Sequence, residues 1–164
     1  MKSKNEIFEA AEGLMKEKEF TIIKEDRERP WGGFLVIEES QAQRFAQEFF
    51  PEEDFQQLKL SEKLSPKILL VAPGKRLSWQ YHFRRAEIWR CIGGTAAVAT
   101  SLTDEEKDRH ILNAGEKIKL QQGERHRLIG LEDWGMIAEI WQHTDANYPS
   151  DEEDIVRLQD DFGR

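Results

Sequence analysis

The chain has 164 residues, and its 24 Lys and Arg against 32 Asp and Glu leave a formal net charge of −8. That balance excludes a nucleic-acid binder that depends on a global positive field. Hydrophobic residues form 38% of the chain, enough for the core of one domain, which excludes wholesale disorder. No apolar run approaches the roughly 18 residues of a membrane span, and the acidic start is unlike a signal peptide. The lone Cys91 cannot form an intramolecular disulfide, so we expect a cytoplasmic protein.

The first 65 residues are expected to hold helices and the first strands. Residues 5–20 carry an apolar stripe typical of an amphipathic helix. Ser40 is expected to cap a second helix with Phe45 on its apolar face. Short strands are predicted around the turn that contains Trp31, and residues 51–66 are predicted to form a polar connection.

From Lys67 onward, short apolar or alternating segments recur between turns that contain Pro or Gly. Strands at such near-regular spacing predict an antiparallel sandwich or barrel, so the expected fold class is mainly β. The predicted strands are 68–72, 77–83, 87–92, 95–100, 110–112, 117–120, 126–129 and 136–141. Residues 146–164 are acidic and are predicted to be a solvated tail.

The strand at residues 77–83 has one polar face. Gln80 and His82 lie on this face, and the simplest interpretation places it in water. A short connection would instead bring Glu87 of the next strand beside these two residues, and His126 follows in a later strand. An amide, two imidazoles and a carboxylate suit a divalent cation such as zinc, manganese, iron or nickel.

These four residues fall within two spaced motifs. The first is Gly74-x5-Gln80-x-His82-x4-Glu87-x6-Gly94, and the second is Gly115-x5-Gln121-x-Gly123-x2-His126. Both resemble the paired motifs of cupins, with Gln80 in place of the first His and Gln121 in place of the usual Pro. Longer segments resemble the C-terminal cupin of type II mannose-6-phosphate isomerases, which is often fused to a mannose-1-phosphate guanylyltransferase. These segments are Arg29-Pro30-Trp31-Gly32 and residues 73–80, 85–89, 123–128 and 154–164.

The resemblance implies a single cupin domain over residues 1–164. Its double-stranded β-helix, or jelly-roll barrel, would have its core at 66–145 and one or two N-terminal helices. It also implies a metal-dependent aldose–ketose isomerase of a phosphorylated sugar, in which one divalent ion is held by Gln80, His82, Glu87 and His126. Zinc is the first candidate, followed by manganese, iron, nickel and cobalt. Free-standing relatives that share the stretch RRAEIW are named phosphoheptose isomerase, so the expected sugar is mannose-6-phosphate or a heptose phosphate.

Binding an anionic sugar requires fixed cations, and moving a proton between C1 and C2 requires a base. Across residues 75–90, five basic residues against one acidic residue give a local charge of +4, which suits an anionic ligand. The candidate phosphate-binding residues are Arg76, Arg85, Arg127 and Arg164. The candidate catalytic residues are Lys75, Arg76, Arg85 and Glu139, and the base is left open among Lys75, Glu139 and Asp160.

Phe83, Arg84 and Ile88 stand where the family usually has other residues, including histidines, which keeps two alternatives open. One is a non-catalytic sugar-binding or regulatory cupin. The other is a metal-dependent oxygenase, in whose two-His, one-carboxylate set Gln80 would be an extra neutral ligand. The expected partners are a small sugar phosphate and a second copy in a homodimer, with no nucleic acid and no membrane. The strand aromatics are expected mostly in the core and His143 at the surface.

Overall fold

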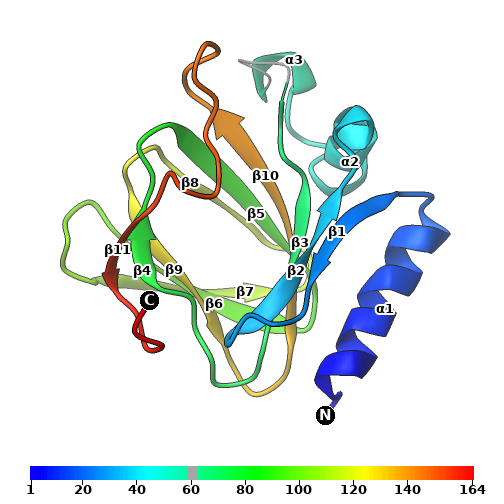
Figure 1. The fold of residues 1–164 in the computed structure, drawn as a ribbon, viewed down its shortest axis with the longest axis horizontal. Coiled ribbons are helices and arrows are strands. Elements are labelled where there is room, and N and C mark those ends of the chain that lie inside the picture. The colour runs from blue at the N-terminus through cyan, green and yellow to red at the C-terminus, as the bar shows by residue number, and fades with distance from the viewer. Residues whose placement is uncertain (59–62) are drawn as a thin grey trace.

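The computed structural model describes residues 1–58 and 63–164; residues 59–62 of the predicted polar connection lie outside the described residues. The described strands form two antiparallel sheets that face each other (Figure 1). The larger sheet has the order β1 (Ile22–Asp26), β2 (Gly32–Ile37), β3 (Lys67–Val71), β10 (Gly135–His143), β5 (Arg85–Gly93) and β8 (Lys117–Leu120). The smaller sheet has the order β11 (Val156–Gln159), β4 (Trp79–Tyr81), β9 (Arg125–Gly130), β6 (Thr95–Ser101) and β7 (Asp108–Asn113). The expected mainly β sandwich is therefore confirmed.

Apolar side chains form two layers, one on each side of the larger sheet. β3 is buried along its whole length, so its alternating side chains enter two different buried environments. Leu69 and Val71 join the core between the sheets, where they meet Leu128 of the smaller sheet. Ile68 and Leu70 join the core on the outer face of the larger sheet. The larger sheet therefore forms the middle layer of the molecule.

Helices cover that outer face. α1 (Lys4–Glu17) and α2 (Ala42–Phe49) direct their apolar stripes at it, and the short α3 (Phe55–Leu58) follows. The stripes contribute Phe8 and Phe45, both fully buried. None of the described helices is long and apolar enough to cross a membrane.

The two main helices begin differently. α1 starts with a capping box in which Ser3 accepts from the Glu6 N–H and Glu6 accepts from the Ser3 N–H. Ser40 does not cap α2 as predicted. It lies in a 3₁₀ turn (Glu39–Gln41), and its own N–H donates to Glu38. The extra turn moves the start of α2 beyond Ser40.

The predicted strand at 77–83 is regular only over β4. Before it, Arg76 forms an isolated bridge with Ile129, and the four consecutive residues from Leu77 to Gln80 are all buried. Strict alternation of exposed and buried residues is therefore lost here. Gln80 of β4 lies opposite His126 of β9, which places two predicted ligands on neighbouring strands.

Most acidic residues of the predicted C-terminal tail are exposed, but the segment that carries them is held against the smaller sheet. β11 pairs with β4, with Arg157 opposite Gln80, and Ser150 and Asp154 are buried. The Asp154 carboxylate accepts the backbone N–H groups of Phe83 and Arg84. These hydrogen bonds offset the cost of burying the carboxylate. The C-terminal segment is therefore part of the barrel wall beside the predicted ligands.

Candidate metal centre

Three of the predicted ligands converge between the sheets. His82 follows β4, Glu87 lies in β5 and His126 lies in β9. The His82 Nε2 atom is 3.0 Å from Glu87 Oε1, and the His126 Nε2 atom is 4.0 Å from the same oxygen. One ligand atom from each residue lies within 4.8 Å of the other two. We call these three buried residues the triad.

Backbone carbonyl groups orient both imidazoles of the triad. His82 Nδ1 lies 2.7 Å from the carbonyl oxygen of Asp154, and His126 Nδ1 lies 2.9 Å from that of Glu124. Because a carbonyl oxygen only accepts, each Nδ1 carries a proton, and the Nε2 atom of each ring is directed at the centre. The buried His126 Nε2 has no hydrogen-bond partner among the described residues. The triad therefore has the donor atoms and orientation that could bind a divalent metal ion.

The surrounding charges favour an ionised carboxylate and a neutral imidazole. Burial by itself raises the pKa of Glu87, but the Arg85 charge and then the contact with His82 lower it well below its usual range. Burial lowers the pKa of His126 to about 4. Near neutral pH, Glu87 is therefore an anion and His126 an uncharged donor, which are the protonation states that bind a cation.

Arg85 lies directly beside the triad. Its Nε donates to Glu87 Oε1 at 3.0 Å, and its Nη2 lies 3.2 Å from His82 Nε2. Its guanidinium carbon lies 3.6 Å from the centre of the Trp141 ring, and Nη1 donates to the Ser150 hydroxyl. Arg85 therefore balances the buried charge of Glu87, and its guanidinium is held by contacts with Glu87, Ser150 and Trp141.

Gln80 is close to the triad but turns its nitrogen toward it. Its Nε2 lies 3.5 Å from His82 Nε2, and its Oε1 accepts from the Ser78 hydroxyl at 2.5 Å. In this arrangement the amide oxygen is occupied by Ser78. The role of Gln80 as a fourth metal ligand stays a prediction.

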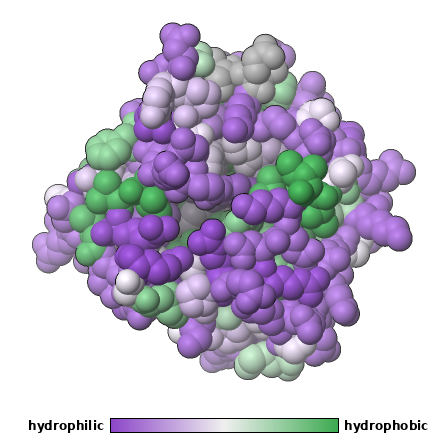
Figure 2. All heavy atoms as spheres, in the orientation of Figure 1, coloured by the Kyte–Doolittle hydropathy of each residue, from purple (hydrophilic) through white to green (hydrophobic). Residues whose placement is uncertain are grey.

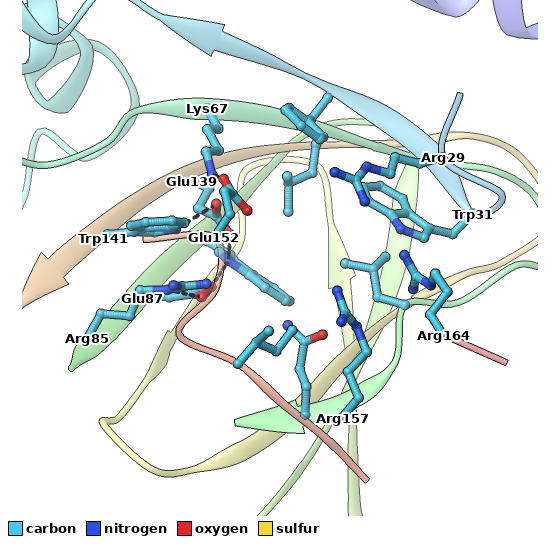
Figure 3. Close-up of a pocket in the computed structure, with 16 residues that line it drawn as sticks. Arg29, Trp31, Lys67, Arg85, Glu87, Glu139, Trp141, Glu152, Arg157 and Arg164 are labelled. Carbon is cyan, nitrogen blue, oxygen red and sulfur yellow. Dashed lines mark hydrogen bonds and ion pairs between the residues drawn. The ribbon is translucent and has the colours of Figure 1, made fainter. Parts of the chain in front are cut away.

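A cavity opens beside the triad, and Figure 2 shows a hollow near the centre of this face, surrounded mostly by hydrophilic residues. Figure 3 shows Arg85, Glu87, Glu139 and Trp141 on one side of the cavity and arginines on the other. The charged lining residues are Arg29, Lys67, Arg85, Arg157 and Arg164 against Glu87, Glu139 and Glu152. The cavity is therefore rich in basic residues although the whole chain is acidic.

The arginines opposite the triad form a cationic cluster of Arg29, Arg157 and Arg164 (Figure 3). Asp160 holds Arg164 at 2.8 Å, and Asp26 holds Arg29 at 3.1 Å. The Arg157 side chain makes no hydrogen bond within the described part of the chain, and burial together with the Arg164 charge lowers its pKa. Three guanidinium groups at one end of a cavity can bind a phosphate group.

Glu139 lies on the same side of the cavity as Glu87. Its two oxygens accept the indole N–H groups of Trp141 at 2.9 Å and Trp89 at 2.7 Å. Burial and the nearby Glu87 carboxylate raise the pKa of Glu139 to about 8. A buried carboxyl group that can change protonation near neutral pH is suited to proton transfer.

Three other predicted site residues do not line the cavity. Lys75 is exposed. Arg76 is paired with Asp161 at 2.6 Å, because the irregular backbone before β4 takes it out of register with Gln80. Arg127 is buried and donates to the Leu77 carbonyl and to Gln159. Since His126 and Leu128 point into the barrel, alternation in β9 directs Arg127 away from it.

The predictions from sequence missed Arg29, Lys67 and Arg157 as cavity residues. Arg29 and Arg157 stand in segments that carry the family resemblance, so a signal for these two was present. Lys67 begins β3 and is 6% exposed, with its Nζ 4.0 Å from the centre of the Trp141 ring. A lysine that opens a strand gives no sequence signal for such burial.

His143 is more buried than its predicted surface position allows, whereas most of the strand aromatics are buried as predicted. His143 is 2% exposed, so its predicted surface position was wrong. It accepts the Ser150 N–H at its Nδ1 and lies 3.2 Å from the Ser65 hydroxyl at its Nε2. Trp89 and Trp141 are buried, as expected, but they also line the cavity.

Two facing antiparallel sheets that enclose a His-Glu-His centre define a cupin with a candidate metal site. A family profile described as "Mannose-6-phosphate isomerase C-terminal" matches residues 38–160, and the chain belongs to this family. It is 33% identical over 111 residues to a mannose-1-phosphate guanylyltransferase of Salmonella montevideo, which covers 67% of this chain and 22% of that protein. It is 31% identical over 126 residues to the alginate biosynthesis protein AlgA of Pseudomonas aeruginosa, which covers 76% of this chain and 24% of that protein. The chain thus aligns with a fifth to a quarter of the length of these relatives.

Solved structures support the fold. The capsular polysaccharide assembling protein CapF from Staphylococcus aureus superposes with a TM-score of 0.54 at 13% identity, over 85% of this chain and 34% of that chain. An oxalate decarboxylase from Lactobacillus farciminis gives a TM-score of 0.54 at 15% identity, over 82% and 33%. At such identities the likeness describes the architecture alone.

Proposed function

We propose that this protein is a metal-dependent aldose–ketose isomerase that acts on a sugar phosphate, either mannose-6-phosphate or a heptose phosphate. The observation that carries the proposal is a single cavity with a candidate metal centre on one side and the cationic cluster on the other. A metal-dependent isomerase of phosphorylated sugars uses both features, one for the carbonyl end and one for the phosphate end. The family supports the same reaction.

In this proposal His82, Glu87 and His126 hold a divalent ion, whose chemistry is to polarise the sugar carbonyl as a Lewis acid. The cationic cluster binds the phosphate and thereby fixes the orientation of the sugar chain. Glu139 accepts a proton from one of the two carbons that exchange oxidation state and returns it to the other, while a second proton passes from the hydroxyl oxygen of one carbon to the carbonyl oxygen of the other. Trp89 and Trp141 donate to Glu139 and hold its carboxyl group in place.

The direct test is a coupled assay of the zinc-replete and manganese-replete protein against a panel of phosphorylated aldoses and ketoses. We expect turnover of a C6 or C7 aldose phosphate and no turnover of the corresponding free sugars. Tight metal binding without turnover of any panel member would contradict the isomerase and favour a sugar-binding module.

The first variant to measure is His82→Ala, with metal content determined by elemental analysis. Because His82 lies 3.0 Å from Glu87 within the triad, its removal is expected to abolish both metal binding and isomerase activity. Arg76→Ala is the matched control, since Arg76 lies outside the cavity. A His82→Ala protein with unchanged metal content would show that the triad is not the metal site.

A further inference from the structure

Residues 150–154 hold the chain segment that carries His82. The Asp154 carbonyl accepts from His82 Nδ1 at 2.7 Å. The Asp154 side chain is fully buried, and its oxygens accept the Phe83 N–H at 2.9 Å and the Arg84 N–H at 3.0 Å. One residue therefore contacts three consecutive residues between β4 and β5.

The same segment also holds the partner of Glu87. Arg85 Nη1 donates to the Ser150 hydroxyl and to the Asp151 carbonyl, both at 2.9 Å. The Ser150 hydroxyl in turn donates to Asp154 Oδ2 at 2.6 Å. The contacts of Asp154 with His82 and of Ser150 with Arg85 thus form one hydrogen-bonded network.

The carboxylate has a role that other side chains cannot fill. Two backbone N–H groups and one hydroxyl donate to its two oxygens, so three donors require an acceptor with several lone pairs. An amide offers one oxygen, and alanine offers none. The Asp154 N–H also donates to Asp151, and β11 pairs with β4 two residues further on, but the carboxylate is what joins Asp154 to the backbone of Phe83 and Arg84, directly after His82.

We propose that Asp154 is a positioning residue of the metal centre: its buried carboxylate anchors the chain so that its own carbonyl holds His82 in the Nδ1-protonated form with Nε2 directed at the triad. This inference rests on the proposed metal centre but concerns the ring of His82 itself. Partners of this kind, which orient a ligating imidazole, contribute about 10- to 100-fold to metal affinity.

The test measures zinc affinity by competition with a chromogenic chelator for the full chain and four variants. Asp154→Ala is expected to weaken zinc binding by about 10- to 100-fold. The zinc affinity of Asp154→Asn is expected to lie between those of Asp154→Ala and the native protein. Glu153→Gln is the matched control, because Glu153 is an exposed carboxylate one residue away and should bind zinc as the native chain does. His82→Ala reports whether the triad is the zinc site at all.

Imidazole ¹⁵N NMR of the metal-free proteins gives a second readout that needs no zinc. We expect the Nδ1-protonated tautomer of His82 in the native chain and in Glu153→Gln, and a mixture of tautomers in Asp154→Ala. If Asp154→Ala does not fold, Asp154→Asn replaces it, since it keeps the size of the side chain and removes one of the two carboxylate oxygens.

The possible failures are distinguishable. Zinc affinity in Asp154→Ala within threefold of the native value, with binding lost in His82→Ala, overturns the positioning role and leaves the metal centre intact. Zinc retained by His82→Ala overturns the metal centre, and the tautomer measurement then decides the role of Asp154. An unchanged His82 tautomer in Asp154→Ala overturns that role in either case.

Discussion

At the scale of the residue, two of the carboxyl groups that line the cavity have pKa values shifted in opposite directions. Glu87 faces Arg85 and two imidazoles, which lower its pKa, whereas burial raises the pKa of Glu139 to about 8. Trp89 donates to both groups. Environments that separate the pKa values of neighbouring carboxyl groups allow one to remain an anion while the other exchanges a proton.

Glu139→Gln should separate proton transfer from metal binding. The amide preserves size and polarity but cannot accept a proton from carbon, so we expect kcat to fall about 10²- to 10⁴-fold with zinc content unchanged. Steady-state kinetics and elemental analysis check this together. Native kcat in the variant would remove Glu139 from the mechanism.

His143 predicts a pH dependence of stability. Burial lowers its pKa to about 4 from the ordinary value of 6.5, so between pH 6.5 and 4 the unfolded chain binds the extra proton. Its contribution to stability is therefore present above pH 6.5 and lost as the pH falls towards 4. The loss from pH 7 to pH 5 is about 2 kcal/mol. Urea unfolding at both pH values should show this loss, and in His143→Asn the difference between them should shrink by that amount.

At the scale of the element, β11 joins the two halves of the cavity. Its backbone pairs with β4 beside Gln80, while its Arg157 lies in the cationic cluster with Arg164 from the residues that follow (Figure 3). Pairing to an edge strand is possible for this acidic segment because β4 presents free backbone groups on that side. A segment with a polar composition thus contributes Asp154, which contacts His82, and Arg157, which belongs to the cationic cluster.

Arg157→Ala should weaken substrate binding without affecting the metal. Loss of one charge-assisted hydrogen bond to phosphate costs about 1.5–3 kcal/mol, so KM for the sugar phosphate should rise about 10- to 150-fold. The Arg157 side chain makes no hydrogen bond within the described chain, so folding should be little changed. Arg76→Ala serves as the control, and an equal KM in both variants would place the phosphate elsewhere.

At the scale of the whole molecule, the centre connects elements from both sheets. His82 and His126 belong to the smaller sheet and its loops, while Glu87 belongs to the larger one. A bound ion would therefore crosslink the two layers and stabilise the fold as a whole. The chain is acidic as a whole while the cavity is basic, because five of the 24 basic residues line it against three carboxylates.

Zinc should raise the thermal unfolding midpoint of the intact chain. At a free concentration 100 times the dissociation constant, a ligand that binds only the folded state adds about 2.7 kcal/mol. For a protein of this size that corresponds to roughly 5–11 °C. Calorimetry with and without zinc measures the shift, and His82→Ala should show none. A native midpoint that zinc does not move would contradict the crosslink.

Several features could be predicted from sequence because they depend on neighbours along the chain. The alternation in residues 117–120 predicts β8 with its bounds, and the period of two places Gln80 and His82 on one face. The motif spacing predicts His82, Glu87 and His126 as a group, and the structure brings them together. The predictions that Ser40 caps the second helix and that Arg76 lines the site are wrong, because a 3₁₀ turn and an irregular strand start shift the local register.

The sequence by itself determined the fold class, the family and the three residues of the triad, because strand periodicity and motif spacing are local properties. Only the tertiary structure decided which cations face the triad. Alternation along β9 directs Arg127 away from the cavity. The pairing of strands far apart in the chain brings Arg29 and Arg157 to the cavity. It also decided that Asp154, in a segment that looks solvated, is buried against His82. Asp154 is buried because the C-terminal segment pairs with the edge strand β4, and the composition of the segment does not predict this pairing.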